Sequence, residues 1–421
     1  MNIINEYRLY NGLRVVAQPI DSLRSVSVGV WVATGSLKET EREAGLSHFI
    51  EHMLFKGTEN RTAQQIAQEM DDIGAQMNAF TSRDCTCYYV KATGEHLAKA
   101  VDMLSDMILC PRFDAEEMER EKNVVLEEIL MAEDAPEDVV FELLSRAAFG
   151  DAPMARPVLG SKQSVAAFTP DDLRQYMKQH YCAENLLLSV AGSFDEKELL
   201  DLATRYFGEV APSGAEDAYP AAPTRSRKKV LAASKDIEQA HIALMFPAYG
   251  SRDERYFPLS VLNNALGGYM SSRLFQRIRE QSGLAYAVYS YVQPCLDSGA
   301  LAIYVGTGAA QAERLVSELL EEVRLLREKG LREDEFIRSR NQLRGSLILS
   351  GESSTSRMTS VGKQTLLFGK ARGEEDVLAL LDAVTPERIQ AILEDVFDEA
   401  ALCAGLVGRD AAALERLGEL W

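Results

Sequence analysis

Cysteine, histidine, tryptophan and long apolar runs are all scarce in this chain of 421 residues. Its six cysteines are scattered, which is too sparse for a disulfide scaffold and is typical of a reducing compartment. No run of about eighteen apolar residues occurs, so we expect no membrane-spanning helix. The first residues lack a basic segment followed by an apolar one, so we expect no secretory signal and a cytoplasmic location.

Basic residues are also in deficit, because 45 Lys and Arg stand against 64 Asp and Glu, a net charge of −19. Binding to nucleic acid or to an anionic membrane requires a cationic face, so we expect neither as a partner. The rest of the composition, 46% hydrophobic and 26% charged, is that of an ordinary globular protein. At about 150 residues per domain, the length predicts two or three domains.

Cys85 and Cys87 form a C-x-C pattern, but no second cysteine pair follows to complete a zinc site. Residues two apart on a strand share a face. Two packed thiols are therefore the favoured interpretation, with metal binding as the alternative.

The first half of the chain alternates between strand and helix patterns. Period-two alternation of β-branched residues indicates strands, and capping residues and glycines mark helix ends. The clearest capping signals are Thr62 and the box formed by Asp114 and Glu117. We expect strands at Leu13–Gln18, Val26–Val32, Gln76–Thr81, Cys85–Ala92 and Asn185–Ala191, and helices at Glu41–Lys56, 62–72 and 114–131.

A Pro- and Ala-rich stretch, Ala211–Ser226, predicts a linker, after which the pattern of the first half returns. The strand Ala240–Phe246 is followed by Gly250 and a serine, 215 positions after the same pair at Gly35. An internal duplication is favoured over two unrelated α/β domains. We therefore expect domains at 1–212 and 229–421, joined by a linker at 213–228.

Two of the five histidines lie one helical turn apart. His48, Glu51 and His52 stand at positions i, i+3 and i+4, which places them on one helix face. Two neutral imidazoles so placed can bind one side of a tetrahedral metal, and the carboxylate between them can handle a water proton. Chance predicts this pattern on the order of 0.006 times per chain, so a metal site is favoured over two packed histidines.

A catalytic zinc usually has three protein ligands and an open position. The other histidines each lie alone, so a carboxylate is the better candidate for the third ligand. The helix expected at 114–131 offers Glu121 and Glu128, which are seven residues apart and so share a face, whereas Glu127 lies on a neighbouring one. Spacing alone leaves open whether these residues bind metal or form an ordinary solvated acidic face.

The run HFIEH at 48–52 is the inverted zinc motif. With its surroundings, the chain resembles the pitrilysin/insulinase family of inverzincin zinc metallopeptidases, above all their processing-peptidase branch. The resemblance implies an α+β fold of two tandem homologous domains, each a mainly antiparallel β-sheet packed with helices (the processing-peptidase/LuxS-like metallohydrolase fold). It also implies one Zn²⁺ per chain bound by His48, His52 and Glu128, with Glu51 as general base and Glu121 as a supporting residue.

A second segment resembles the edge strand by which this family receives peptides through β-augmentation. Outside the family context, a plain sheet strand would be the better interpretation. The residues concerned are Asn78, Ala79, Phe80 and Thr81.

In the second half, the glycine-rich segment Gly267–Leu274 also resembles the family, and Arg279 and Tyr286 match its Arg/Tyr pair. In that role the two side chains would donate hydrogen bonds to a developing oxyanion. Outside the family both would be assigned structural roles. At the position equivalent to 48–52 the second half reads NNALG, residues 263–267, which holds no ligand set. This predicts a single metal per chain.

These features predict a zinc-dependent endopeptidase that acts on unstructured peptides or targeting sequences. Longer relatives hold four such domains, so we expect a homodimer in which Arg279 and Tyr286 complete the site of the other copy, in a chamber between subunits. The alternatives are a non-catalytic or partner-dependent subunit of a heteromeric processing peptidase, another metallohydrolase, and a metal-dependent binding module. The intact motif argues against the first, and Glu51 argues against the last.

Overall fold

The computed structural model describes residues 3–212 and 228–421, so the predicted linker lies outside the described residues except for Lys228. The chain divides into two compact units, neither of which is a continuous half of the sequence. The first unit comprises Met1–Ile129, Pro157–Pro220 and Ile348–Glu374, and the second comprises Leu130–Arg156, Ala221–Leu347 and Glu375–Trp421.

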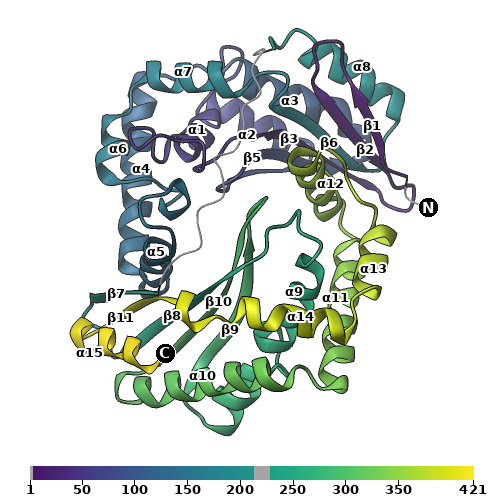
Figure 1. Ribbon diagram of the computed structural model, residues 1–421. Coiled ribbons are helices and arrows are strands. Elements are labelled where there is room, and N and C mark those ends of the chain that lie inside the picture. The colour runs from purple at the N-terminus through teal and green to yellow at the C-terminus, as the bar shows by residue number, and fades with distance from the viewer. Residues whose placement is uncertain (1–2, 213–227) are drawn as a thin grey trace. The chain divides into compact units, whose positions relative to one another are not determined.

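The first unit is built on a six-stranded sheet with the strand order β1-β2-β6-β3-β5-β4 (Figure 1). β2 and β6 are parallel, and every other neighbouring pair is antiparallel. All five predicted strands are present to within one residue, and the short, polar β1 was not predicted. The strands are β1 (Asn5–Arg8), β2 (Arg14–Pro19), β3 (Ser25–Val32), β4 (Gln76–Thr81), β5 (Thr86–Thr93) and β6 (Leu186–Gly192).

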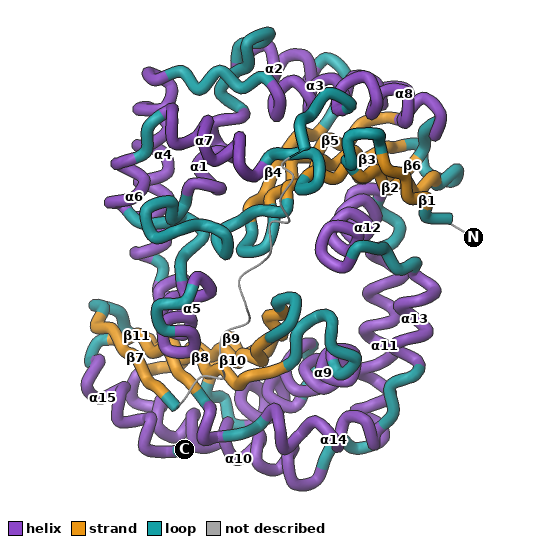
Figure 2. The backbone as a smooth tube through the Cα atoms, turned by 45° about the horizontal axis from the view of Figure 1, so that its top comes forward, coloured by secondary structure: helices purple, strands orange, loops and turns teal. Residues whose placement is uncertain are grey.

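Helices cover both faces of this sheet, which explains why β3 is buried along nearly its whole length. Successive side chains of a strand point to opposite faces, and Val26, Val28 and Val30 enter the core shared with α1 and α3. Figure 2 shows α12 on one side of the sheet and α3 and α8 on the other. The helices are α1 (Leu46–Leu54), α2 (Ala63–Asp71), α3 (Leu97–Leu109), α4 (Ala115–Asp134), α6 (Lys162–Ala167), α7 (Pro170–His180), α8 (Glu196–Phe207) and α12 (Ser354–Phe368).

Helix α12 comes from the second half of the sequence but packs on the sheet of the first unit. Trp31 Nε1 donates a hydrogen bond to Ser189 Oγ at 3.0 Å, and Ser189 donates to the carbonyl of Met358, also at 3.0 Å. Glycines permit this close approach, because a Cβ on Gly362 would lie 2.3 Å from Trp31 Nε1 and one on Gly29 would lie 2.3 Å from Met358 Sδ.

The second unit contains a five-stranded sheet with the order β7-β11-β8-β10-β9. It repeats the order β2-β6-β3-β5-β4 of the first sheet, including one parallel pair at the corresponding place, β7 with β11. This repeat is the topology that an internal duplication predicts. The strands are β7 (Lys229–Ser234), β8 (Gln239–Ala248), β9 (Ala285–Pro294), β10 (Gly299–Gly308) and β11 (Cys403–Gly408).

Alternating residues of the second sheet also enter two separate cores. Ala243 and Met245 pack with Val140 and Leu144 of α5, a helix from the first half of the sequence. Figures 1 and 2 show α10 and α14 on the side of the sheet opposite α5. The helices are α5 (Pro136–Phe149), α9 (Tyr256–Asn263), α10 (Ala312–Lys329), α11 (Glu333–Ser350), α13 (Glu374–Asp382), α14 (Pro386–Val396) and α15 (Ala411–Glu415).

The helix predicted at Glu41–Lys56 begins later than expected, because α1 spans only Leu46–Leu54. Gly45 precedes it with a φ of +89°, a left-handed conformation that does not continue a helix. The buried carboxylate of Glu39 then accepts the backbone N–H groups of Gly45 and Ser47, both at 2.8 Å. A cap from six residues upstream leaves no local sequence signal, which is why the prediction was wrong there.

The other predicted helix starts are present. Thr62 caps α2 in a full capping box with Gln65, and Asp114 accepts the backbone N–H groups of Glu116 and Glu117 at the start of α4. Cys85 and Cys87 are both buried free thiols. Among the described residues, no helix combines the length and the apolar character that a bilayer crossing requires.

Candidate metal centre

Helix α1 has an apolar face and a polar one. Phe49 and Ile50 are fully buried in the core. His48 and His52 lie on the other face with 13% and 18% of their side chains exposed, and Glu51 lies between them in the sequence. The histidines therefore do not supply the packing that holds α1 in place.

The three predicted ligands converge. Nε2 of His48 lies 3.8 Å and Nε2 of His52 lies 3.7 Å from Oε2 of Glu128 on α4. The two imidazole rings meet edge to face, with centroids 4.6 Å apart. Within residues 3–212 and 228–421, this is the one group of three His, Cys, Asp or Glu side chains that comes close enough to hold a metal ion.

This donor set fits Zn²⁺. Tetrahedral bonds of about 2.0–2.2 Å place donor atoms roughly 3.4 Å apart, which is close to the two separations measured here. Burial, together with the charge of His52, lowers the pKa of His48 to about 4. His48 is therefore neutral at pH 7, which is the form that binds metal. Three protein donors leave a fourth position for water or substrate.

Glu121 contacts one of the histidines through its carboxylate. Its Oε1 lies 2.8 Å from Nδ1 of His52, and its Oε2 lies 2.7 Å from the Lys56 ammonium. Burial alone would raise the pKa of Glu121, but the hydrogen bonds from His52 and Lys56 outweigh it and hold that pKa below its usual value. Because a carboxylate only accepts hydrogen bonds, Nδ1 is the donor and Nε2 is directed at Glu128. Lys56 was not predicted, although it follows His52 by one helical turn.

Glu51 is held by a residue of the sheet. Thr81 Oγ1, at the end of β4, donates a short hydrogen bond to Oε2 of Glu51. Burial raises the pKa of Glu51, and this effect exceeds the lowering by Thr81 and His52. A raised pKa suits a carboxylate that must both accept and release a proton. Sequence reasoning missed this contact, because no local pattern links a strand residue to a helix thirty positions earlier.

The predicted substrate segment lies in β4, which forms one edge of the first sheet. In the described part of the chain, β4 pairs only with β5, so its outer side has no strand partner. Asn78 is exposed, and Ala79, Phe80 and Thr81 are half-buried. The strand thus has an edge available for main-chain pairing.

Arg279 and Tyr286 belong to the second unit, whereas the candidate metal ligands belong to the first. The Arg279 guanidinium carbon lies 4.4 Å from the ring centre of Tyr286 and 4.7 Å from that of Phe275. Tyr286, on β9, is 79% exposed. The two predicted residues therefore form a contacting pair.

The segment that corresponds to the zinc motif has a structural role in the second unit. Residues 264–268 form a π-helical turn. The buried amide of Asn264 donates to the carbonyl of Ser339 at 3.1 Å and to Gln342 at 3.0 Å. The side-chain amide of Asn264 thus makes hydrogen bonds inside the second unit.

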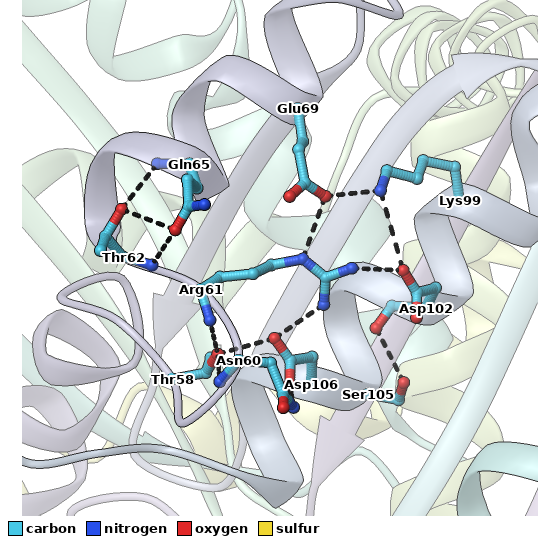
Figure 3. Close-up of polar contacts among 10 residues, drawn as sticks. All are labelled: Thr58, Asn60, Arg61, Thr62, Gln65, Glu69, Lys99, Asp102, Ser105 and Asp106. Carbon is cyan, nitrogen blue, oxygen red and sulfur yellow. Dashed lines mark hydrogen bonds and ion pairs between the residues drawn. The ribbon is translucent and has the colours of Figure 1, made fainter.

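A second polar cluster lies between α2 and α3 (Figure 3). The guanidinium of Arg61 pairs with Glu69 at 3.0 Å, Asp102 at 2.6 Å and Asp106 at 2.7 Å. Lys99 also pairs with Glu69. The cluster lines a pocket of about 490 Å³. Each of its three carboxylates is paired with Arg61 or Lys99, so the cluster joins the two helices rather than forming a metal site.

The chain is similar to a known family of proteins. Residues 14–162 match the family model of insulinase (peptidase family M16), and residues 167–343 match that of the peptidase M16 inactive domain. The chain is 43% identical to the uncharacterized zinc protease YmxG of Bacillus subtilis, over 94% of this chain and 96% of that protein. It is 38% identical to an uncharacterized zinc protease of Streptomyces coelicolor, over 92% and 86% of the two chains.

A solved structure shows the same fold. The crystal structure of a protease from Helicobacter pylori matches with a TM-score of 0.91 at 20% identity, covering 97% of this chain and all of that one. The α+β architecture of two similar units is thus the fold predicted from the sequence. Since the family models and the relatives together span most of the sequence, the chain belongs to the insulinase family, peptidase family M16.

Proposed function

We propose that this chain is a zinc-dependent endopeptidase that hydrolyses unstructured peptides or targeting and processing sequences. The observation that carries the proposal is the convergence of two imidazole nitrogens, from His48 and His52, on one carboxylate oxygen of Glu128. Glu51 lies on the same helix, between the two histidines in the sequence. The names of the relatives as zinc proteases support the assignment.

His48, His52 and Glu128 would hold Zn²⁺, one ion per chain, while Glu121 keeps His52 in the binding tautomer. A bound zinc ion supplies Lewis acidity, which polarises a peptide carbonyl and makes water more acidic. Glu51 would accept the proton of the attacking water on its carboxylate. It would then deliver that proton to the amine nitrogen as the C–N bond breaks, and so return to its starting state.

The peptide would lie extended along the outer side of β4, at Asn78–Thr81. Pairing with a strand edge uses main-chain hydrogen bonds, which read the backbone rather than the side chains. The preference for particular sequences would then be loose. Folded proteins would be poor substrates, because their backbone groups are already paired.

Arg279 and Tyr286 would donate hydrogen bonds to the carbonyl oxygen of the substrate as negative charge develops on it. We propose that they act on the site of the other copy in a homodimer. This arrangement predicts that a Glu51→Gln chain and an Arg279→Ala chain, each inactive alone, regain activity when mixed dimers form. Mixed dimers that assemble but stay inactive would contradict it.

The test of the function is cleavage of a panel of quenched, unstructured peptides, with a chelator and with zinc added back. We expect activity that the chelator removes and zinc restores, and that Glu51→Gln abolishes while zinc stays bound. Activity in zinc-loaded Glu51→Gln protein would refute Glu51 as the base. Absence of cleavage by the zinc-loaded wild type would instead support a partner-dependent or non-proteolytic role.

A further inference from the structure

Thr81 ends β4, and its side chain lies on the face of the sheet that α1 covers. The alternation along the strand explains this direction. Ala79, two residues earlier, packs against the core that includes the buried residues of α1. Phe80 contacts Trp31 on the opposite face of the sheet, with ring centroids 5.6 Å apart. Thr81 shares the face of Ala79, and its hydroxyl therefore reaches Glu51 on α1.

This hydroxyl is the one group that hydrogen bonds the Glu51 carboxylate in the described part of the chain. Threonine is β-branched, so its χ1 angle is restricted and the direction of the hydroxyl follows from the strand backbone. The contact occupies Oε2 of Glu51 and leaves Oε1 for the reaction. One side chain thus sets how the carboxylate is turned.

We propose that Thr81 is a positioning residue for Glu51, and that its hydroxyl couples the orientation of the carboxylate to the edge strand β4. The inference rests on the proposed function, in which Glu51 transfers the proton and β4 receives the peptide. A peptide that pairs with β4 adds main-chain hydrogen bonds to the strand that carries Thr81. Binding of substrate and orientation of Glu51 are therefore linked through a single side chain.

The kinetic test compares Thr81→Val, which keeps the branched shape but removes the donor, with Thr81→Ser, which keeps the donor. We expect Thr81→Val to lower kcat by about tenfold to a hundredfold and to change KM by less than about threefold, because a misplaced base affects the reaction rather than binding. Thr81→Ser should restore most of kcat, and zinc content should not change. Thr93→Val, at the exposed end of β5, is the matched control. A wild-type kcat in Thr81→Val, or an effect on KM alone, would overturn the inference.

A second test needs no catalysis. In the metal-free protein, Thr81→Val should lower the unfolding midpoint when Glu51 is present, because a half-buried carboxylate loses its hydrogen bond. In a Glu51→Leu background the same substitution should change the midpoint little. Equal shifts in the two backgrounds would show that Thr81 does not act through Glu51. Because this cycle is independent of peptide cleavage, it separates failure of the inference from failure of the proposed function.

Discussion

Glu121 Oε1 accepts a hydrogen bond from Nδ1 of His52 at 2.8 Å, on the side of the ring opposite the nitrogen that faces Glu128. A buried carboxylate therefore sets both the tautomer and the orientation of His52, one of the candidate metal ligands. His48 lacks this support, because its Nδ1 is buried with no hydrogen-bond partner in the described part of the chain. The two histidines of one helix are thus held in different ways.

Replacing Glu121 should weaken zinc binding. We expect Glu121→Ala to lower zinc affinity by about tenfold to a hundredfold, because the ring of His52 loses the partner that orients it. Competition with a chromophoric chelator measures this affinity. Glu127→Ala is the control, since Glu127 is exposed on the same helix. Equal affinities in Glu121→Ala and the wild type would show that Glu121 has no supporting role.

Removing the metal should lower stability. A ligand that binds only the folded state stabilises it by roughly 2.7 kcal/mol at a free concentration of a hundred times Kd. We therefore expect a chelator to lower the unfolding midpoint in calorimetry and added zinc to restore it. His52→Ala should make the unfolding midpoint insensitive to chelator and to zinc, because only two of the three metal donors would remain. A midpoint in the wild type that is insensitive to both treatments would argue against a zinc site.

The cluster around Arg61 should make stability depend on acid pH. Burial raises the pKa of Asp106, but hydrogen bonds from Asn60, Arg61 and Thr58 outweigh it, so the net pKa lies below its usual value. The folded carboxyl thus binds a proton more weakly than the unfolded one, whose pKa is about 3.9. Its stabilising effect is fully present above about pH 4 and is lost as the pH falls through the lower, folded value.

Substitution of Asp106 tests this dependence. At pH 7 we expect Asp106→Asn to reduce the free energy of unfolding by about 1–3 kcal/mol, because a charge-assisted hydrogen-bond network is broken. In urea titrations the difference from the wild type should shrink as the pH falls below about 4. Asp21→Asn, at an exposed position, should have little effect. If the difference in free energy of unfolding stays constant with pH, the loss of stability comes from altered packing and not from the removed charge.

Replacing either of two helical glycines by alanine should change the stability of the protein, in opposite directions for the two positions. A Cβ on Gly362 of α12 would lie 2.3 Å from Nε1 of the buried Trp31, whereas one on Gly345 of α11 meets nothing within 4 Å. We expect Gly362→Ala to destabilise the protein by about 1–3 kcal/mol through overpacking. Gly345→Ala should stabilise it by roughly 0.5–1 kcal/mol, because alanine loses less backbone entropy in a helix.

Thermal and urea unfolding measure both changes. The pair serves as its own control, since the same methyl group is added to a helix in each case. A gain of stability at Gly362 would contradict the close packing of α12 against Trp31, and a loss at Gly345 would contradict the open space around that position on α11.

Local patterns predicted five strands of the first sheet and the starts of α2 and α4. The alternation in Val26–Val32 and the cap at Thr62 each involve residues within a few positions of one another, and both elements are present. The predicted start of α1 was wrong, because Glu39 caps this helix from outside it. The packing of α5 on the second sheet and of α12 on the first was not predicted either. It depends on contacts between residues that lie far apart in the sequence.

For the candidate site, the sequence by itself determined that His48, Glu51 and His52 share one helix face, because the helical period places i, i+3 and i+4 together. It could not choose between metal binding and solvation for the glutamates of α4. Only the tertiary structure decided which histidine atoms these glutamates contact, by placing Glu128 against Nε2 of both histidines and Glu121 against Nδ1 of His52. It also brought Thr81 to Glu51. These contacts depend on how α4 and the sheet pack around α1, and no period within one element encodes that packing.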